Sequence, residues 1–498
     1  MSRKTCIATI DVGTTSVKVC LFTPTLTPLA VSVCEYALQA RGNRVEAEAG
    51  QYLQAVQNGF AEVLAVDYEI AAIGLSTQGE TLTLVDGQGA PLRPFIVWLD
   101  SRAEKEAQAL CKAFSPQQFY QETGLPSIDG ALPLAKLMWL KRNEPALFES
   151  ARRFVLLEDY LLHWLTGRFV SEKSLQTSTG WFSLSKDDFW QDALSILNVR
   201  KERFPDLVEC GEVVGGLRPE AADFLGLPAG VPVVAGAMDQ TAAALAAGCI
   251  RPGIVTETTG TALVMAACTD SPAFSSGHRV TIYRHALPGK YLYLPIANTA
   301  GMALRWFRDN FCLDLPAGAE GYAALSAMAA QAPCGCGGLV FLPFLSGSVD
   351  PDSCPEARAV FFGASLSTTR PYFVRSVMES VAFLLKDFAG MMTELGYRIE
   401  TIRSLGGGAQ SAVWQQIKAD ILDCPLSVPV CREASAAGAA LLAGWGTGII
   451  APNTIPVCGE AALYTPNAGH AQAYQAAYSL YRKLYPAIRP LFQKEKED

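Results

Sequence analysis

Two aspartates follow apolar, strand-like runs, and a carboxylate at such a position can bind a cation or accept a proton. Asp11 follows the run Cys6–Ile10, and Asp239 lies just beyond the run Val231–Gly236. An aspartate at a strand end can hold a hydrated Mg²⁺, and one at the carboxyl edge of a sheet can take a proton from an attacking hydroxyl. Each also has an ordinary structural explanation, Asp11 as a turn residue of a hairpin and Asp239 as a helix N-cap. The residues alone leave both readings open.

Three glycine-containing turns are suited to binding phosphate or nucleotide, because glycine lets backbone amides approach a ligand closely and hydroxyls add donors. The residues concerned are Gly13 with Thr14, Thr15 and Ser16; Gly260 with Thr261; and Gly407, Gly408 and Ser411. The third turn is not a dinucleotide fingerprint, because Ser411 occupies its last glycine position. A P-loop is also absent, since the only Gly-Lys pair, Gly289-Lys290, is followed by Tyr291.

A polar and aromatic cluster can recognise a polyol. Trp98, Asp100 and Arg102 alternate along the chain, so an extended segment places them on one side. Asp and Arg can hydrogen-bond sugar hydroxyls, and Trp can pack on the carbon face of a sugar. Gln78 and Glu80 come one strand earlier. The structural alternative is a surface ion pair beside a core tryptophan.

The elements that must position these residues alternate between strand-like and helix-like runs, which favours an α/β fold around a buried sheet. Strands are expected at 6–10, 16–22, 70–76, 231–236, 254–258 and 402–405, and helices at 51–66, 101–114, 134–142, 240–247 and 413–422. The hairpin that carries Asp11 is repeated where Thr258-Thr259-Gly260-Thr261 joins two strands. The repeat predicts two related domains that face each other across a cleft, residues 1–249 and 250–498.

Composition excludes several classes of protein. The 498 residues carry a formal net charge of −8, half of them are hydrophobic, and no basic run exceeds two residues, so we expect no nucleic-acid partner. The uncharged stretch 434–451 is rich in Ala and Gly and is expected to be a packed helix, with no membrane partner. With no signal-peptide pattern at the N-terminus and 14 scattered cysteines, we expect reduced thiols and a cytoplasmic location. The pair Cys334-x-Cys336 lacks the second pair that a zinc site needs.

Seven motifs occur in one order and together resemble the FGGY family of carbohydrate kinases, from about residue 5 to 450. They are Asp11-x-Gly13-Thr14-Thr15-Ser16, Trp98-x-Asp100-x-Arg102, Pro133-x-x-Lys136-x-x-Trp139, Ala235-Gly236-x-x-Asp239-Gln240, Thr258-x-Gly260-Thr261, Gly406-Gly407-Gly408-Ala409 and Glu433-Ala434-x-Ala436-x-Gly438-Ala439-Ala440. The specificity comes from their order and spacing, since no single motif identifies the family.

The resemblance implies two ribonuclease-H-like domains of the actin, hexokinase and Hsp70 superfamily, with ATP and sugar bound in a central cleft. By this analogy Asp239 is the general base and, with Asp11, binds Mg²⁺ through water. The analogy places the phosphates between Gly13, Thr14, Thr15 and Ser16 on one side and Gly260 and Thr261 on the other. Gly407, Gly408 and Ser411 border the adenosine, and the sugar residues are Gln78, Glu80, Trp98, Asp100, Arg102, Asp239 and Gln240.

The substrate is less well defined. Thr77-Gln78-Gly79-Glu80 lacks the His of the Met-His-Gly segment typical of xylulose kinases and the Arg of the Gln-Arg-Glu segment of glycerol kinases. We expect a five- or six-carbon ketose, a polyol or a sugar acid as acceptor. The alternatives are an ATPase switch like actin or Hsp70 and a non-catalytic sugar-binding member of the fold. The resemblance also suggests a homodimer.

Overall fold

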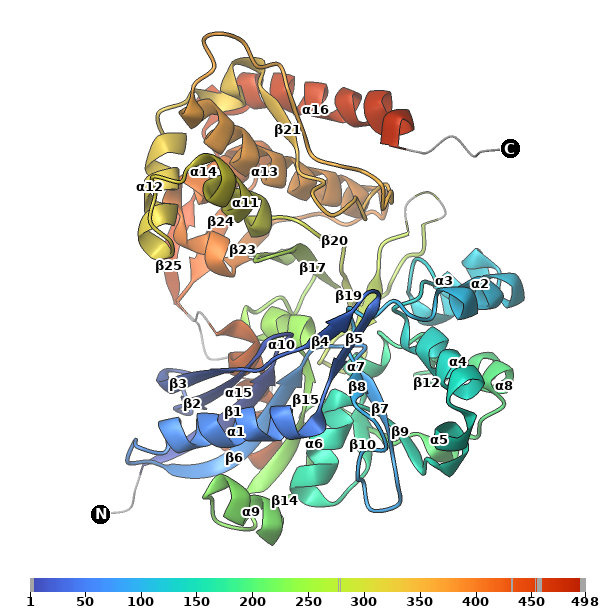
Figure 1. Ribbon diagram of the computed structural model, residues 1–498. Coiled ribbons are helices and arrows are strands. Elements are labelled where there is room, and N and C mark those ends of the chain that lie inside the picture. The colour runs from blue at the N-terminus through green and yellow to red at the C-terminus, as the bar shows by residue number, and fades with distance from the viewer. Residues whose placement is uncertain are drawn as a thin grey trace. The chain divides into compact units, whose positions relative to one another are not determined.

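The chain forms two compact units, which the computed structural model describes over residues 4–275, 277, 279–430, 433–452, 454 and 459–492. Unit 1 comprises the described residues of Met1–Ile250, Asp270–Leu292 and Glu433–Cys458. Unit 2 comprises those of Arg251–Thr269, Tyr293–Arg432 and Gly459–Asp498. Strands and helices alternate in both units, so the predicted α/β class is confirmed (Figure 1).

The central sheet of unit 1 has the strand order β14-β15-β6-β1-β2-β3. Its strands are β1 (Thr5–Val12), β2 (Ser16–Phe22), β3 (Pro28–Glu35), β6 (Glu69–Thr77), β14 (Val213–Gly216) and β15 (Pro232–Met238). The first three strands form an antiparallel meander, while β6 runs parallel to β1 and β15 runs parallel to β6. The expected hairpin is confirmed, although its first strand continues through Asp11 and Val12 into what the sequence indicated was a turn.

A smaller sheet and a set of helices complete unit 1. The smaller sheet contains β4 (Gln39–Arg41), β5 (Arg44–Ala47), β7 (Leu82–Val85), β8 (Phe95–Ile96) and β9 (Arg153–Leu156). The helices are α1 (Ala49–Val63), α2 (Glu104–Ala113), α3 (Pro116–Thr123), α4 (Pro133–Asn143), α5 (Pro145–Ser150), α6 (Leu157–Thr166), α7 (Lys173–Gln176), α8 (Gln191–Leu197), α9 (Pro219–Leu225), α10 (Asp239–Ala246) and α15 (Ala434–Thr447). Short strands are β10 (Val170–Glu172), β11 (Phe182–Ser183), β12 (Asp188–Phe189), β13 (Asp206–Val208) and β18 (Ile282–Arg284).

Helices cover both faces of the central sheet of unit 1. On one face α1 packs on β2 and β3, because Tyr52, Val56 and Phe60 recur at helical spacing and are buried. On the other face α15 packs on β1, β6 and β15 (Figure 1). The sheet is therefore buried on both sides, which explains why β1 is buried along almost its whole length.

Small residues let α15 approach the sheet and α10 closely. A Cβ added to Gly438 would lie 2.0 Å from the carbonyl oxygen of Ala242, and one added to Gly74 would lie 2.4 Å from that of Ala439. The uncharged stretch is thus a tightly packed helix, as predicted. Among the helices whose residues are described, none is both long and apolar enough to cross a membrane.

Unit 2 repeats the central topology of unit 1. β16 (Ile254–Thr259) and β17 (Leu263–Thr269) form an antiparallel hairpin, and β23 (Thr401–Leu405) and β24 (Leu426–Pro429) extend it in parallel. The other strands are β20 (Ile296–Ala297), β21 (Val340–Leu342), β22 (Val360–Phe362) and β25 (Glu460–Tyr464), while β19 (Tyr291–Tyr293) crosses the unit boundary. The helices are α11 (Gly301–Phe311), α12 (Ala319–Ala329), α13 (Arg370–Glu394), α14 (Ala412–Leu422) and α16 (Ala471–Phe492).

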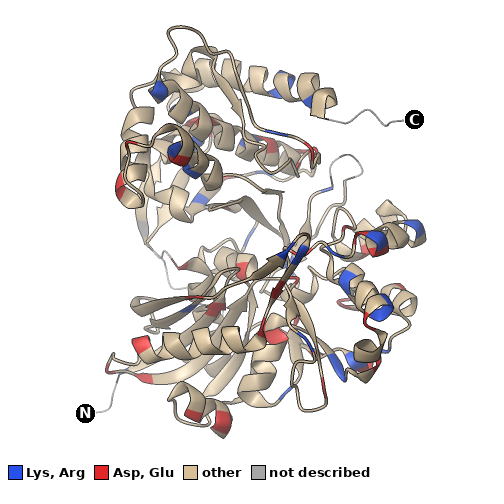
Figure 2. Cartoon of the chain, viewed as in Figure 1, with Lys and Arg blue, Asp and Glu red and all other residues tan. Residues whose placement is uncertain are grey.

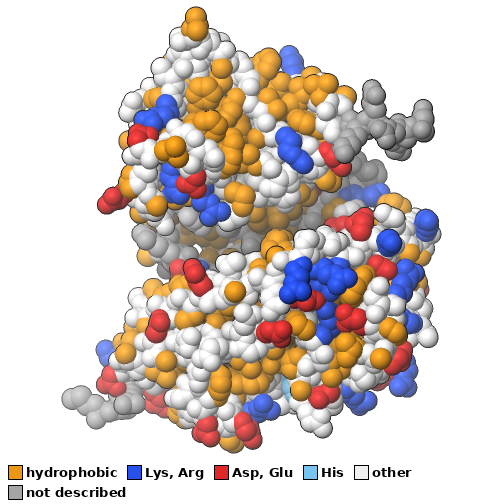
Figure 3. Space-filling view, viewed as in Figure 1, with side chains coloured by type: hydrophobic (Ala, Val, Ile, Leu, Met, Phe, Trp, Pro, Cys, Tyr) orange, Lys and Arg blue, Asp and Glu red, His pale blue; other side chains and the backbone are white. Residues whose placement is uncertain are grey.

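Charged residues of both signs are interspersed in both units (Figure 2). The visible surface of each unit likewise mixes apolar, acidic and basic side chains (Figure 3). This distribution is compatible with the acidic net charge of −8 and with recognition of a small molecule.

Candidate active site

Asp11 and Asp239 lie at the same edge of the central sheet of unit 1. Asp11 pairs with Ser76 of β6 on one side, and Ala237, two residues before Asp239, pairs with Ser76 on the other. Parallel strands present their carboxyl ends at a common edge, and this edge brings the two carboxylates together. Asp239 begins α10, but the N-cap of this helix is Met238, so the alternative of an N-cap role for Asp239 is wrong.

The electrostatics of the two aspartates reflect their burial. Burial raises the pKa of Asp11 to about 7, with a further contribution from the charge of Asp239, while Lys18 opposes the shift. Burial also raises the pKa of Asp239 to about 6, although its carboxylate accepts a 2.6 Å hydrogen bond from the backbone N–H of Gln240. A cation placed beside both groups would favour their charged forms.

Two charged residues beside Asp11, Lys18 and Glu433, are not among the predicted site residues. Lys18 lies opposite Asp11 in the β1–β2 hairpin and forms a 2.5 Å ion pair with Glu433, the residue that precedes α15. Strand pairing could have identified Lys18, since it follows from the hairpin register. Glu433 belongs to the last of the seven motifs, but its place beside Asp11 requires the three-dimensional fold.

The turn after β1 is held by backbone and aromatic contacts. The N–H of Gly13 donates to the carbonyl of Ser16 at 3.0 Å, and the hydroxyl of Tyr36 donates to the carbonyl of Gly13. The Thr14 hydroxyl accepts a 3.0 Å hydrogen bond from the indole of Trp98, which ties this turn to the predicted sugar residues. Gly13 does not have a positive φ, so backbone conformation does not require a glycine there.

The predicted sugar residues divide into exposed and buried groups. Trp98 is 37% exposed, and Glu80 and Gln240 are half-buried. Gln78 is buried, and its backbone N–H donates to the carbonyl of Val12, which fixes the end of β6 against the end of β1. Asp100 is completely buried.

The Asp100–Arg102 pair is part of the protein interior. Asp100 accepts hydrogen bonds from the guanidinium and backbone N–H of Arg102 and from the backbone N–H of Val45, at 2.6–3.0 Å. Arg102 also forms a 2.8 Å ion pair with Glu46. The alternative of a surface ion pair beside a core tryptophan is therefore wrong, because the pair is buried and Trp98 is exposed.

Unit 2 contains a cavity of about 520 Å³ that collects the remaining predicted ligand residues. Gly260 and Thr261 line it from the β16–β17 turn, and Gly407, Gly408 and Ser411 line it from the segment between β23 and α14. Other parts of its wall come from Gly301, Met302 and Arg305 of α11, Tyr322 of α12 and Trp414 of α14. The volume is in the range that holds a ligand of nucleotide size.

The glycines at this cavity differ in whether the fold could accommodate a side chain at their position. Gly406 has φ = +77°, and a Cβ on Gly408 would lie 2.6 Å from the Cγ2 of Thr259, so the fold requires both glycines. A Cβ on Gly407 would meet no atom within 4 Å. Ser411 is the N-cap of α14, where its side chain accepts a hydrogen bond from the N–H of Trp414. Gly407 thus leaves space at the cavity that packing of the protein does not need.

A buried ion pair supports the wall of the cavity. Lys418 of α14 donates to Glu257 at 2.7 Å and to the Thr259 hydroxyl at 2.8 Å, and Ser404 also donates to Glu257. Lys418 and Glu257 are fully buried. This network joins β16, β23 and α14 directly behind the Gly260 and Gly408 turns.

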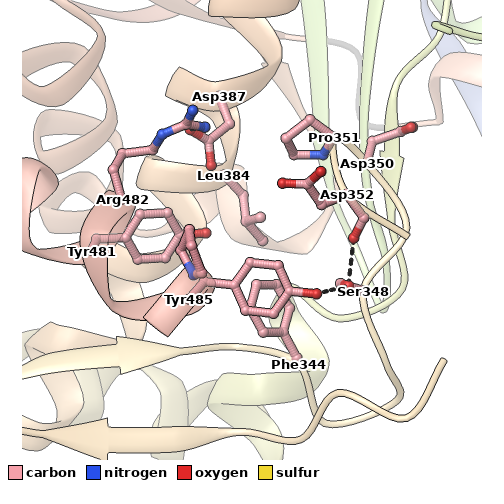
Figure 4. Close-up of a pocket in the computed structure, with 11 residues that line it drawn as sticks. Phe344, Ser348, Asp350, Pro351, Asp352, Leu384, Asp387, Tyr481, Arg482 and Tyr485 are labelled. Atoms are coloured by element: carbon pink, nitrogen blue, oxygen red, sulfur yellow. Dashed lines mark hydrogen bonds and ion pairs between the residues drawn. The ribbon is translucent and has the colours of Figure 1, made fainter. Parts of the chain in front are cut away.

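A second, smaller cavity of about 50 Å³ lies in unit 2, between the loop 348–352 and helices α13 and α16 (Figure 4). Its polar groups are paired with protein partners. Ser348 lies 2.8 Å from the Tyr485 hydroxyl and donates to the carbonyl of Asp352, while Asp387 accepts from Arg482. No residue predicted from the sequence lines this cavity, and we assign it no part in catalysis.

Comparison with known protein families identifies the class of this protein. The model of the FGGY family of carbohydrate kinases matches as an N-terminal domain at residues 6–246 and as a C-terminal domain at residues 254–447. The chain therefore belongs to this family, and the predicted ribonuclease-H-like fold class is confirmed. It is a carbohydrate kinase, which transfers a phosphoryl group from ATP to a hydroxyl of a sugar or polyol. The family does not favour the alternative of an actin- or Hsp70-like switch.

Individual relatives cover almost the whole chain. Xylulose kinase of Escherichia coli is 31% identical over 431 residues, 85% of this chain and 86% of the relative. Gluconokinase of Bacillus subtilis is 29% identical over 452 residues, 89% of this chain and 87% of the relative. The crystal structure of a "xyloylose kinase" from Brucella ovis superimposes with a TM-score of 0.89 at 29% identity, covering 98% of this chain and all of that one.

Proposed function

We propose that Asp239 is the general base of this kinase and that the carboxyl edge of the unit 1 sheet binds the sugar. Phosphoryl transfer depends mainly on alignment and charge neutralisation, so one carboxylate that accepts the proton of the attacking hydroxyl is sufficient. The observation that carries the proposal is the position of Asp239 at the end of β15, half-buried and beside Asp11. Its pKa of about 6 leaves it mainly deprotonated at neutral pH.

Asp11 and Asp239 fit a hydrated Mg²⁺. Mg²⁺ in nucleotide sites usually keeps several waters and takes one or two protein carboxylates together with phosphate oxygens. The carboxylates of Asp11, which is buried, and of Asp239, which is half-buried, lie at one edge and each has a raised pKa, so a divalent cation would stabilise their charged forms. When bound, the ion supplies neutralisation of phosphate charge.

We further propose that the cavity of unit 2 binds the nucleotide, with Gly407, Gly408 and Ser411 beside the adenosine. In this proposal the phosphates accept hydrogen bonds from backbone amides of two turns. One turn is Gly13–Ser16 in unit 1, and the other contains Gly260 and Thr261 in unit 2. In this proposal the general base and the sugar site belong to residues 1–249, and the nucleotide site belongs to residues 250–498. A homodimer and a cytoplasmic location stay predictions.

For the sugar, Trp98, Glu80, Gln78 and Gln240 are the candidate contacts. Asp100 and Arg102 hold each other in the interior, so a direct contact with sugar requires their pairing to open. The relatives named xylulose kinase and gluconokinase support a five- or six-carbon ketose, polyol or sugar acid as acceptor.

A coupled ADP-release assay over ketoses, polyols and aldonic acids tests this function. At least one acceptor is expected to stimulate ADP release, and Asp239→Asn is expected to abolish that release while nucleotide binding stays largely intact. Nucleotide binding by titration calorimetry is the control for folding. Sugar-dependent turnover by Asp239→Asn at near wild-type rate would show that the base is another group.

A further inference from the structure

Glu80 lies at the carboxyl edge of the unit 1 sheet, where the sugar is proposed to bind, and it contacts two residues from distant parts of the chain. Glu80 follows β6 with φ = +61°, a conformation that non-glycine residues adopt rarely. The Tyr283 hydroxyl, from β18, lies 3.4 Å from Oε1 of Glu80. Lys136 of α4 donates to the backbone carbonyl of Val97 at 2.9 Å and lies 3.4 Å from that of Glu80. We call Glu80, Lys136 and Tyr283 the Glu80 cluster.

Neighbouring negative charges raise the pKa values of residues in this cluster. Burial raises the pKa of Glu80 to about 7, and the carboxylate of Asp129 adds to the shift while Lys136 opposes it. The charges of Glu80, Asp239 and Asp129 all help raise the pKa of Tyr283, after burial. A further negative charge beside Glu80 is therefore disfavoured.

Two cations near Glu80, Lys136 and Arg102, contact protein partners. Lys136 is completely buried and directs its ammonium group at the carbonyls of Val97 and Glu80. The guanidinium of Arg102 is bonded to Asp100 and Glu46. By contrast, the half-buried side chains of Glu80 and Asp239 retain exposed surface. Of these four charged residues, the two acids are therefore more exposed than the two cations.

We propose that the Glu80 cluster makes this kinase select an uncharged sugar or polyol and reject the sugar acid of the same chain length. This inference rests on the proposed function, in which Asp239 and Glu80 face the sugar. Sugar hydroxyls can donate to the Glu80 carboxylate, whereas the carboxylate of an aldonic acid is repelled by it. Tyr283 is a positioning residue for Glu80, and it lies outside the seven motifs.

Matched acceptor pairs that differ only at one terminal group test the selection. Suitable pairs are xylitol with D-xylonate, D-arabinitol with D-arabinonate and D-glucitol with D-gluconate, with D-xylulose as an additional uncharged acceptor. In every pair that reacts at pH 8, where Glu80 is mainly charged, kcat/KM for the uncharged member is expected to be higher by about tenfold or more. An aldonate preferred over its polyol would overturn the proposal.

Binding without turnover separates this inference from the proposed function. Titration calorimetry of the same compounds in the presence of the non-hydrolysable ATP analogue AMP-PNP and Mg²⁺ measures the preference directly. Tighter binding of the uncharged member without ADP release supports the selection and contradicts the proposed function. Tighter binding of the aldonate, or binding of none of the uncharged compounds, overturns the selection.

Two variants test the residues. Glu80→Gln keeps the shape and removes the charge, so the preference for the uncharged member is expected to fall about tenfold. Glu69→Gln, at the opposite end of the same strand and exposed, is the matched control and should leave the ratio unchanged. Tyr283→Phe is expected to raise KM for the uncharged acceptor several-fold with little change in kcat. An unchanged ratio in Glu80→Gln would overturn the proposal, provided that circular dichroism shows a folded protein.

Discussion

At the scale of single residues, the site concentrates acidic groups where burial opposes their charge. Asp11 is 8% exposed, and burial together with the charge of Asp239 raises its pKa to about 7. In the unfolded chain an aspartate has a pKa near 3.8. An acid with a raised folded-state pKa destabilises the fold as pH rises through that window, and the cost is complete above the folded-state pKa. Function and stability therefore conflict at Asp11.

Asp11→Asn is expected to increase the free energy of unfolding by about 1 to 3 kcal/mol at pH 8, because a buried charge is removed. The gain should shrink as pH falls below about 7 and disappear below about 4, where Asp11 is neutral in both states. Urea unfolding with EDTA and without nucleotide measures this. Asp309→Asn, at an exposed position, is the control. A variant less stable than the wild type at pH 8 would contradict the electrostatic argument.

At the scale of elements, the turn between β23 and α14 combines glycines that the fold needs with one that it does not. Gly408 packs against Thr259, and Gly406 adopts a left-handed conformation. Gly407 faces open space at the 520 Å³ cavity. The buried Lys418–Glu257 pair holds this turn against β16. The turn is therefore tightly packed at Gly408 and has free space at Gly407, where a ligand is proposed to bind.

Gly407→Leu is expected to weaken ATP binding at least about tenfold, since the side chain occupies cavity space, while the melting temperature changes little. Gly408→Leu is the contrasting variant, because its side chain collides with Thr259 and should lower the melting temperature itself. Calorimetric titration with ATP and thermal unfolding distinguish the two. Normal ATP affinity in a folded Gly407→Leu protein would place the nucleotide elsewhere.

At the scale of the whole molecule, the sequence predicted the strands and turns better than the contacts between distant residues. The hairpins around Asp11 and Gly260 and the strands before Asp239 and Gly406 were predictable, because continuous apolar runs end at turn residues there. The contacts of Tyr283 with Glu80 and of Glu433 with Lys18 were not predictable, because they join positions 203 and 415 residues apart with no periodic pattern between them. Burial of the Asp100–Arg102 pair also depends on Val45 and Glu46, from another strand.

A fragment of residues 1–249 is expected not to fold on its own. It lacks α15, which covers one face of β1, β6 and β15, so that apolar face would be exposed to water. The fragment should bind the dye ANS and show no cooperative thermal transition, whereas co-expression with residues 250–498 should restore both properties to those of the full chain. A cooperative transition of the isolated fragment would show that α15 is dispensable.

The late position of α15 also shapes how the protein is made. A ribosome finishes the strands of the unit 1 sheet by Met238 but reaches the end of α15 only at Thr447. At about 5 to 20 residues per second, that interval lasts roughly 10 to 40 s. Throughout it the nascent sheet lacks the helix that covers one of its apolar faces, so that face is open to contact with other chains.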